Sequence, residues 1–450
     1  MYKPLDILGP NVVTLNGDAW ARHRRITTPP FNERNSSLVW RESLLQAGEM
    51  LKMWVKNGKG PLGGVENTPN DTMVLALNVL MAAGFGKRYH FEGAAQVTET
   101  GDSMGSYRNA LRIVLGDLYQ AVLSGMLKGV PSWAMSKKLL DMKRALREVK
   151  EHISKMIEEE RAGLSEKRDE GDNLLSVLLK ASESEAMGNS RSGLSDEEII
   201  GNLFIYNVAG HDTTANTLGY AITMLATDVE LQGWLREEIN SVFGEEENVE
   251  KWNYEKGFPQ LKRCLAVMVS FGLQLCIVFT TAVKNAKQIL QFETLRLYGP
   301  VFYIPRYTAD SFQHLNIQGK EYPIPPHTHV HLNTAALHTL PSYWGTNSLA
   351  WRPDRWLDEK EELLQPLPGM YNPWTAGPRV CPGKKFAQVE FVAVIARSFQ
   401  LTGVAPKLEE GETQEGAMKR VKEVVADSTL DVTLHMVHPE RVRLVWRDER

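Results

Sequence analysis

Cysteine is scarce in this sequence, and its scarcity excludes several classes of protein. The 450 residues include 3 cysteines, Cys264, Cys276 and Cys381, which are too few and too widely spaced for a disulfide framework or a zinc cluster. A reducing compartment is therefore expected. The chain also lacks an excess of basic residues, and its formal net charge of -4 at pH 7 gives no sign of a nucleic-acid partner.

One cysteine lies in a sequence context that favours metal binding. Cys381 lies in the stretch Trp374-Thr-Ala-Gly-Pro-Arg-Val-Cys-Pro-Gly383, and the apolar spacing of residues 384–399 predicts a helix directly after it. Backbone N–H groups at the start of a helix stabilise an anion, so this position favours the thiolate, the form of cysteine that binds metal. The ordinary alternative is a buried cysteine in a loop rich in glycine and proline.

The order aromatic-x-x-Gly-x-Arg-x-Cys-x-Gly resembles the haem-ligand loop of the cytochrome P450 superfamily, with Trp374 where phenylalanine is usual. The resemblance implies that Cys381 is the axial thiolate ligand of the haem iron and that the cofactor is haem b. It also implies that Arg379 contacts the cofactor, and that the backbone approaches the porphyrin closely at Gly377 and Gly383.

Two arginines elsewhere resemble the residues that hold the haem propionates in this family. A helix predicted for residues 18–28 places Trp20 and Arg24 on one face, as in the family's Trp-x-x-x-Arg helix. Arg306 resembles the arginine of the family's substrate-lining strand, and the planar fork of arginine pairs well with a carboxylate. His338 is a further candidate for a propionate contact. Taken alone, the helix is an amphipathic helix with a solvated basic side, and Arg306 is an exposed residue of a sheet.

A long helix is predicted to follow the capping box Ser195-Asp-Glu-Glu198. Its centre, Ala209-Gly-His-Asp-Thr-Thr214, contains poor helix formers, and the hydroxyl of Thr213 can bond the carbonyl of Ala209. A slightly kinked core helix would explain this pattern. The segment also resembles the signature of the family's helix across the distal haem face. That resemblance implies a local bulge with room for dioxygen, a hydrogen bond to it from Thr213, and proton delivery from water by Asp212.

Glu293 and Arg296 are three residues apart on a predicted helix, a spacing that is common in exposed ion pairs. Together with Arg355, they resemble the family's Glu-x-x-Arg pair and its arginine partner. The resemblance implies a buried triad that locks the core around the cysteine loop. Loss of one member of such a cluster costs about 3–5 kcal/mol.

A run without charged residues interrupts the helix that contains Glu293. Residues 264–283 are long and apolar enough to pass for a transmembrane helix. Joining Met268 to Phe292, however, restores one continuous amphipathic helix. We therefore expect residues 269–291 to be an insertion, produced by a short intron retained in phase, with a real membrane or loop insertion as the alternative.

We expect residues 1–450 to form a single cytochrome P450 domain, mainly α with a smaller β portion (α+β). In family members a membrane anchor, a first helix and a first sheet precede the helix of residues 18–28. The chain is therefore expected to be N-terminally truncated, by on the order of a hundred residues.

The resemblance implies a fungal haem-thiolate monooxygenase of the microsomal type. It would insert one oxygen atom of O2 into an apolar organic substrate in secondary metabolism. Electrons would come from NADPH through NADPH–cytochrome P450 reductase, at the cytosolic face of the endoplasmic reticulum membrane. The pair Asp212 and Thr213 favours this activity over haem-thiolate isomerases and dehydratases, which need no proton delivery. The alternative is a defective gene-model product that binds haem poorly or not at all.

Overall fold

The computed structural model describes residues 5–57, 64–91, 103–126, 131–165, 173–188, 193–244, 246, 248–268, 293–364, 366–431 and 433–448. The chain forms two compact units. The smaller unit consists of residues 265–381, and the larger unit combines residues 2–264 with residues 382–450.

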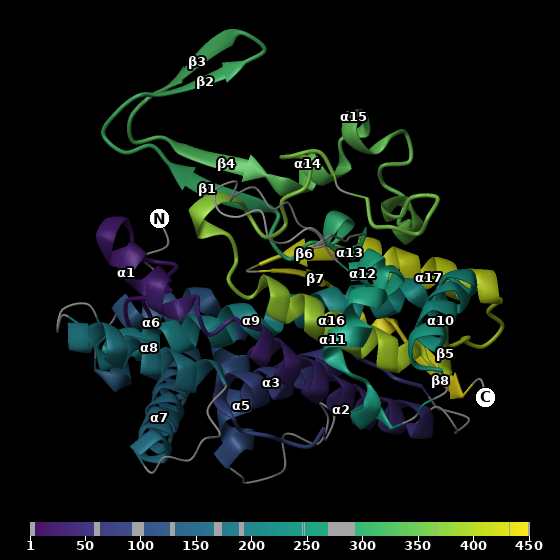
Figure 1. The fold of residues 1–450 in the computed structure, drawn as a ribbon, viewed down its shortest axis with the longest axis horizontal. Helices are drawn as coiled ribbons and strands as arrows, with labels where there is room; N and C mark the ends of the chain where they lie inside the picture. Colours follow the sequence, from purple (N-terminus) through teal and green to yellow (C-terminus); the bar gives the residue numbers. More distant parts are fainter. Residues whose placement is uncertain are drawn as a thin grey trace. The chain divides into compact units, whose positions relative to one another are not determined.

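The larger unit is built mostly from helices (Figure 1). Before residue 264 these are α1 (Gly17–Thr27), α2 (Glu33–Asn57), α3 (Thr68–Phe85), α5 (Ser103–Gly116), α6 (Leu118–Met126), α7 (Lys137–Ser165), α8 (Leu174–Gly188), α9 (Asp196–Leu225), α10 (Val229–Phe243) and α11 (Tyr254–Gly257). Two more follow the smaller unit in the sequence, α16 (Lys384–Phe399) and α17 (Gln414–Ala426).

The centre of the larger unit is formed by two pairs of helices. α9 packs along α3 and α16 packs along α2, while α2 also packs against α3. α9 begins at the predicted capping box, in which the side chains of Ser195 and Glu198 each accept a hydrogen bond from the other residue's backbone N–H. These bonds satisfy N–H groups that the first helical turn leaves without partners. α16 has the predicted bounds, and most of its apolar side chains are buried.

The described strands of the larger unit form two antiparallel pairs. β5 (Thr402–Pro406) pairs with β8 (Leu444–Asp448), and β6 (Ser428–Leu430) pairs with β7 (Leu434–Met436). In the second pair Leu430 lies opposite Leu434. β6 and β7 therefore form a short hairpin, which we call the 428–436 hairpin.

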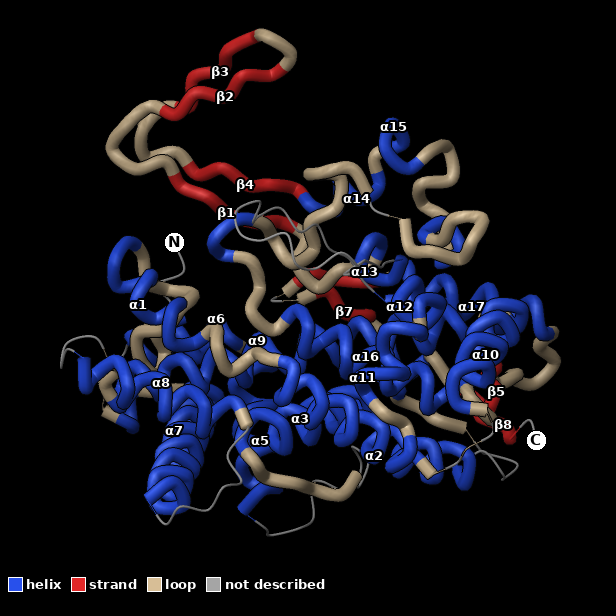
Figure 2. Tube along the Cα trace, in the orientation of Figure 1, coloured by secondary structure: helices blue, strands red, loops and turns tan. Residues whose placement is uncertain are grey.

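The described part of the smaller unit contains short helices and two further antiparallel strand pairs (Figure 2). β1 (Tyr303–Tyr307) pairs with β4 (His329–Asn333), and β2 (Gln313–Ile317) pairs with β3 (Lys320–Ile324). The α-helices that lie wholly within the described part of this unit are α13 (Glu293–Leu297), α14 (Thr334–Thr339) and α15 (Pro341–Trp344). Side chains of β2 and β3 are largely exposed, whereas Glu293 and Arg296 on α13 are buried.

α13 is joined to the end of α12 (Lys262–Met268) by a side-chain hydrogen bond. The Thr294 hydroxyl donates to the Val267 carbonyl at 2.7 Å, although 27 positions separate the two residues in the sequence. Within a helix, a threonine hydroxyl typically bonds the carbonyl four positions earlier. Without the 23 residues of the predicted insertion, Val267 and Thr294 would be four positions apart. The insertion itself, residues 269–291, lies outside the described residues.

Helices with small antiparallel sheets confirm the expected fold class, mainly α with a smaller β portion. Residues 103–126 form two helices, α5 and α6. They separate at Asp117, whose carboxylate accepts a hydrogen bond from the N–H of Gln120 in the first turn of α6 and so stabilises a new helix start.

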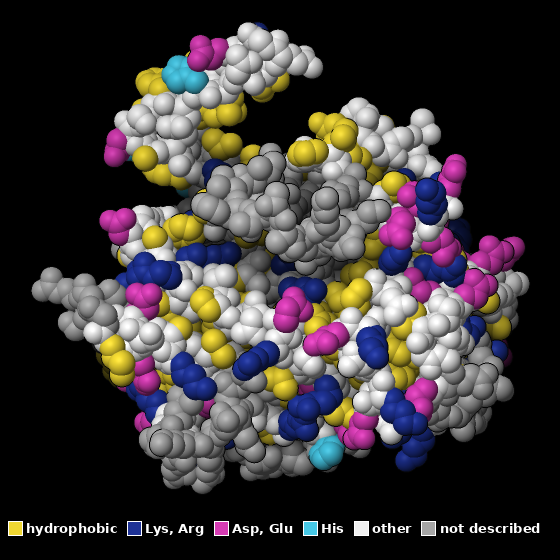
Figure 3. Space-filling model, in the orientation of Figure 1, with side chains coloured by type: hydrophobic (Ala, Val, Ile, Leu, Met, Phe, Trp, Pro, Cys, Tyr) yellow, Lys and Arg dark blue, Asp and Glu magenta, His cyan; other side chains and the backbone are white. Residues whose placement is uncertain are grey.

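Acidic and basic side chains are intermingled on the face shown in Figure 3. No helix among the described ranges is long and apolar enough to cross a membrane. Most of the predicted span at 264–283 lies outside those ranges.

Candidate functional site

The cysteine loop, residues 372–381, is closed by its own backbone. The N–H of Cys381 donates to the Trp374 carbonyl at 3.1 Å, and the N–H of Val380 donates to the Gly377 carbonyl at 3.0 Å. Cys381 is partly exposed and forms no disulfide with Cys264, the other cysteine within the described part of the chain. Its sulfur is therefore in no disulfide with a cysteine of the described residues.

Two residues of this loop have a left-handed backbone. Thr375 has φ = 57° and Gly377 has φ = 76°, a conformation that glycine adopts without the steric cost of a Cβ atom. A Cβ added to Gly377 would meet no other atom within 4 Å, so the loop presents an open surface there. An open backbone surface beside a thiol without a disulfide fits a haem held by thiolate ligation.

β1 places Arg306 beside the cysteine loop. Its guanidinium donates to the Thr375 hydroxyl at 3.3 Å and to the Pro305 carbonyl at 3.1 Å. Arg306 is exposed, and because a guanidinium carries five N–H donors, it retains donors for a carboxylate. Arg379 lies in the same loop, in the 3-10 turn Gly377–Arg379.

Glu293 is the centre of the predicted triad. Its carboxylate is fully buried and accepts hydrogen bonds from Arg296 at 2.7 and 2.8 Å and from Nε of Arg355 at 3.0 Å. Two further donors were not predicted: the backbone N–H of Arg352 at 2.8 Å and the indole Nε1 of Trp356 at 2.9 Å. Both carboxylate oxygens therefore have partners, the condition under which a buried charge is tolerated.

Arg296 connects this cluster to neighbouring segments of the smaller unit. Its guanidinium donates to the carbonyl of His338 at 2.9 Å and to that of Ala350 at 3.1 Å. It also lies over the ring of Trp344, 5.0 Å from the ring centroid. These contacts use the planar fork of arginine, which the single ammonium group of lysine cannot reproduce.

His338 connects the triad to the cysteine loop. Its Nε2 accepts a hydrogen bond from the N–H of Asn372 at 2.9 Å, so the ring proton must lie on Nδ1. Burial, with the charge of Arg296 nearby, lowers the pKa of His338 from 6.5 to about 3. A neutral, buried imidazole bound to the loop backbone has a structural role that the sequence did not reveal.

The centre of α9 carries the predicted threonines. The hydroxyl of Thr213 donates to the Ala209 carbonyl at 2.9 Å, as predicted, and that of Thr214 bonds Gly210 in the same way. α9 is nevertheless an uninterrupted α-helix over all its residues. The local bulge implied by the resemblance is therefore wrong for this structure, because the hydroxyls supplement the backbone hydrogen bonds without breaking the helix.

Asp212, next to Thr213, uses both carboxylate oxygens. Its Oδ2 accepts from the hydroxyl of Thr433 in the 428–436 hairpin at 2.5 Å, and its Oδ1 accepts from the side-chain amide of Asn216 at 3.3 Å. Burial lowers the pKa of the neighbouring His211, whose Nδ1 lies 2.7 Å from the Asn207 carbonyl. Sequence reasoning missed Thr433 and Asn216, although the latter's position four residues after Asp212 gave a signal.

α1 carries the two remaining predicted haem contacts, Trp20 and Arg24, which are one helical turn apart and both partly exposed. Gly383 is the N-cap residue of α16. The predicted haem and relay residues thus divide between the units. The smaller unit holds Cys381, Arg379, Arg306 and Gly377, and the larger unit holds Trp20, Arg24, Asp212, Thr213 and Gly383.

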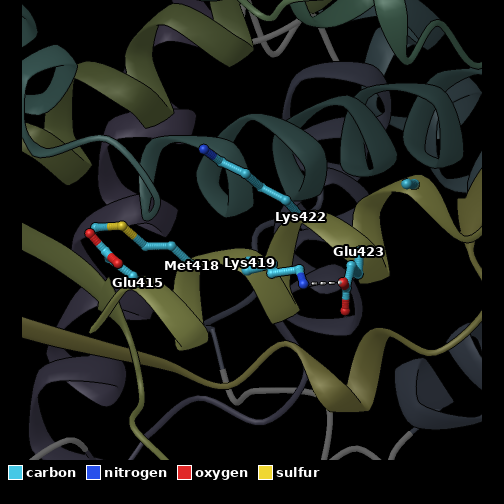
Figure 4. A pocket seen from close by; sticks show the side chains of 6 residues that line it. Glu415, Met418, Lys419, Lys422 and Glu423 are labelled. Atoms are coloured by element: carbon cyan, nitrogen blue, oxygen red, sulfur yellow. Dashed lines mark ion pairs between the residues drawn. The ribbon is translucent and has the colours of Figure 1, made fainter. Parts of the chain in front are cut away.

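A depression on the larger unit is lined by α17 alone, through Glu415, Met418, Lys419, Lys422, Glu423 and Ala426 (Figure 4). An ion pair of 3.7 Å between Lys419 and Glu423 crosses it. A hollow formed by the side chains of a single exposed helix does not enclose a ligand, so it is not a substrate cavity.

Comparisons with known proteins show which family this chain resembles. The sequence model of the family "Cytochrome P450" matches residues 2–263 and 289–421. A cytochrome P450 monooxygenase of Postia placenta is 32% identical over 99% of this chain and 78% of its own length. A monooxygenase of the phomenoic acid biosynthesis cluster of Leptosphaeria maculans is 29% identical over 91% of this chain and 70% of its own length.

The fold has a solved counterpart. A crystal structure of a cytochrome P450 superposes with a TM-score of 0.71 and 19% sequence identity, covering 100% of this chain and 86% of that one. The family match covers most of the chain, and it includes the cysteine loop, the triad and the centre of α9. This chain therefore belongs to the cytochrome P450 family, and it is an oxidoreductase, a monooxygenase that depends on haem.

Proposed function

We propose that this protein uses haem b to insert one oxygen atom of O2 into an apolar small molecule in fungal secondary metabolism. The observation that carries the proposal is the cysteine loop, in which Cys381 lies beside the open surface at Gly377. Haem, when bound, supplies the activation of dioxygen and the transfer of one oxygen atom. The relative from the phomenoic acid cluster supports a place in secondary metabolism.

Five side chains are assigned to binding the cofactor, and the backbone at Gly377 and Gly383 is assigned to close approach to the porphyrin. Cys381 provides the thiolate ligand, and the charge of the thiolate is compatible with its place directly before α16. Arg306 and Arg379 of the smaller unit pair with the propionates. Trp20 and Arg24 of α1 are assigned to the propionates as well. Arginine binds a carboxylate through two parallel hydrogen bonds, and the indole N–H of tryptophan is a hydrogen-bond donor.

Asp212 and Thr213 are assigned to proton delivery. The Thr213 hydroxyl gives its own proton to the Ala209 carbonyl, so its lone pairs remain able to accept another. Asp212 is partly exposed, which lets its carboxylate exchange protons with water and pass them towards the hydroxyl. Positioned acid–base groups of this kind contribute about 10²–10⁴-fold to the rates of enzymes.

The remaining proposals concern the electron donor, the location in the cell and the class of substrate. Electrons are proposed to come from NADPH through NADPH–cytochrome P450 reductase, and the protein is proposed to work at the cytosolic face of the endoplasmic reticulum membrane. Both follow from the family resemblance. The apolar class of substrate is supported by Phe302, Tyr303 and Ile304, in and next to the strand expected to line the pocket.

The reduced, carbon monoxide-bound absorption spectrum of the purified chain tests the haem proposal. We expect the red-shifted Soret band of thiolate-ligated haem, and its loss in Cys381→Ser. Cys264→Ser is the matched control, because Cys264 is buried in the larger unit, and it should keep the band. Haem uptake without this band in the unchanged chain, or a band that survives in Cys381→Ser, would contradict the proposal.

We also propose that residues 269–291 are an insertion from a short retained intron within a single domain of residues 1–450. The family match stops at residue 263 and resumes at residue 289, which supports an interruption here. The hydrogen bond from Thr294 to Val267 supports the interruption too. Without residues 269–291 it would join residues four positions apart, which is the usual spacing of such a bond within a helix.

A chain lacking residues 269–291 separates this proposal from the alternative of a defective product. We expect the shortened chain to take up more haem per polypeptide than the full chain, and the dominant messenger RNA to lack these codons. Persistence of the codons in that messenger RNA would rule out the retained intron. Failure of both chains to take up haem would favour the defective product.

A further inference from the structure

The carboxylate of Asp212 belongs to a closed triangle of hydrogen bonds. Thr433 donates to Oδ2 of Asp212, Asn216 donates to Oδ1, and the Asn216 amide also donates to the Thr433 hydroxyl at 3.2 Å. Thr433 and Asn216 are buried, at 9% and 6% exposure. The triangle therefore holds the Asp212 carboxylate in one orientation through hydrogen bonds to both of its oxygens.

Thr433 and Asn216 contribute differently to this triangle. Asn216 lies on α9 itself, four residues after Asp212, so it follows the helix wherever the helix moves. Thr433 belongs to the 428–436 hairpin, and 221 positions separate it from Asp212 in the sequence. Only Thr433 links the orientation of the carboxylate to an element outside α9 in this triangle.

A further hydrogen bond, separate from the triangle, holds the base of the hairpin on α9. The hydroxyls of Tyr220 and Ser428 lie 2.7 Å apart. Tyr220 follows Asp212 by eight residues, which is about 12 Å along an α-helix. The hairpin is thus attached to α9 at two places, and one of them can be removed while the other still holds it.

We propose that Thr433 is a positioning residue for the proton relay, and that its hydroxyl sets the orientation in which Asp212 delivers protons. This rests on the proposed role of Asp212. A hydroxyl suits the task because it donates to the carboxylate while accepting from Asn216. Valine has nearly the same shape but can do neither, and serine can do both.

The first test reads the carboxylate itself and needs no haem. The full chain is treated with a water-soluble carbodiimide and glycine ethyl ester, and labelling of Asp212 is measured by mass spectrometry. We expect Thr433→Val to raise the labelling rate about five-fold, the equivalent of one hydrogen bond of about 1 kcal/mol. Thr433→Ser should restore the rate of the unchanged chain.

Tyr220→Phe is the matched control. It removes the hydrogen bond between Tyr220 and Ser428 but leaves the triangle around Asp212 complete, so labelling of Asp212 should not change. Equal labelling in Thr433→Val and the unchanged chain would overturn the proposal. An equal rise in Tyr220→Phe would overturn it too, because any loosening of the hairpin would then suffice.

The second test measures hydrogen peroxide released per NADPH consumed, with haem-loaded protein and NADPH–cytochrome P450 reductase. We expect this ratio to rise in Asp212→Asn and in Thr433→Val, and to return to normal in Thr433→Ser. A rise in Asp212→Asn alone would overturn the role of Thr433 and leave the proposed relay intact. No rise in either variant would overturn the relay, and the role of Thr433 with it.

Discussion

The ring of His338 accepts a hydrogen bond from the backbone of Asn372 at 2.9 Å, while its own carbonyl receives the guanidinium of Arg296 at 2.9 Å. One residue thus touches both the buried triad and the start of the cysteine loop. The triad residue Glu293 makes no contact of its own with the loop among the hydrogen bonds of the described residues. The order Glu293, Arg296, His338, Asn372 therefore gives a physical route by which the triad supports the loop.

The lowered pKa of His338 predicts a loss of stability in mild acid. The folded chain keeps this imidazole neutral down to a pKa of about 3, whereas the unfolded chain protonates it below about pH 6.5. Between these values the unfolded state binds more protons, so the free energy of unfolding falls by up to about 1.4 kcal/mol per pH unit as the pH decreases. Urea unfolding of the unchanged chain between pH 7 and pH 4 measures this slope.

The contribution of His338 can be separated from that of other groups. His338→Gln should reduce the slope of the unfolding free energy against pH by up to about 1.4 kcal/mol per pH unit, the contribution of one proton. His211, whose pKa is also lowered by burial, continues to contribute in the larger unit. His329→Gln is the control for the substitution itself, since His329 lies in the same unit but is exposed on β4. An unaltered slope in His338→Gln would mean that this ring titrates normally in the folded chain.

Arg355 and Arg352 are close in sequence but differ in their partners. The Arg355 guanidinium bonds the buried carboxylate of Glu293, whereas that of Arg352 bonds the half-exposed carboxylate of Asp354. Arg355→Ala should destabilise the chain by about 3–5 kcal/mol, because it leaves a buried charge without one of its partners. Arg352→Ala should cost less than about 1 kcal/mol, as expected of an exposed ion pair.

Urea unfolding midpoints and the haem content of the purified variants measure this contrast. Arg352→Ala retains the backbone N–H that bonds Glu293, so it changes the exposed pair alone. Similar losses of stability in the two variants would show that the buried triad has no special importance for the fold.

Glu390 on α16 predicts the opposite dependence on pH. It is buried at 1% exposure, and neither carboxyl oxygen has a hydrogen-bond partner among the described residues. Burial raises the pKa of this carboxyl well above 4.5, so the folded chain holds it protonated where the unfolded chain ionises it. Stability is therefore lost as the pH rises above about 4.5, by up to about 1.4 kcal/mol per pH unit.

Glu390→Gln should remove this loss. The variant is expected to be more stable than the unchanged chain at pH 8 and nearly equal to it at pH 4.5, as measured by urea unfolding at both values. Glu423→Gln, on the exposed side of α17, should change stability by less than about 0.5 kcal/mol at either pH. A Glu390→Gln variant that is less stable at pH 8 would indicate a charged carboxylate with a partner.

Elements that depend on neighbouring residues could be predicted from the sequence. The capping box at Ser195, the bounds of α16 and the hydrogen bond from Thr213 to Ala209 all follow from spacings of four residues or fewer. α17 was not predicted, although its buried residues Ala417, Val421, Val424 and Val425 have helical spacing that the sequence already carried.

Contacts between distant segments could not be predicted in this way. His338 meets Asn372 across 34 positions, and Thr433 meets Asp212 across 221. Such a pair forms because packing brings two segments together, and no local pattern distinguishes Thr433 from the other threonines of the chain. The family resemblance predicted the roles of Asp212 and Cys381, but it did not indicate which residues orient them.

Gly377 and Gly411 allow the backbone strain in the cysteine loop to be separated from its role in haem binding. Their φ angles are 76° and 75°, and a Cβ at either would meet no other atom within 4 Å. Substitution by alanine should therefore destabilise the chain by about 1 kcal/mol at both positions, the cost of a left-handed backbone for a residue with a Cβ.

Only Gly377→Ala should also weaken haem binding, because its methyl group would enter the open surface beside Cys381, whereas Gly411 lies in the loop before α17 of the larger unit. Haem content per polypeptide and urea midpoints of the two variants provide the measurement. Equal haem content at equal loss of stability would contradict the assignment of the open surface to the porphyrin, since strain alone would then account for both variants. A lower haem content in Gly377→Ala alone would attribute the effect to the space that glycine leaves, because the two positions share the same strain.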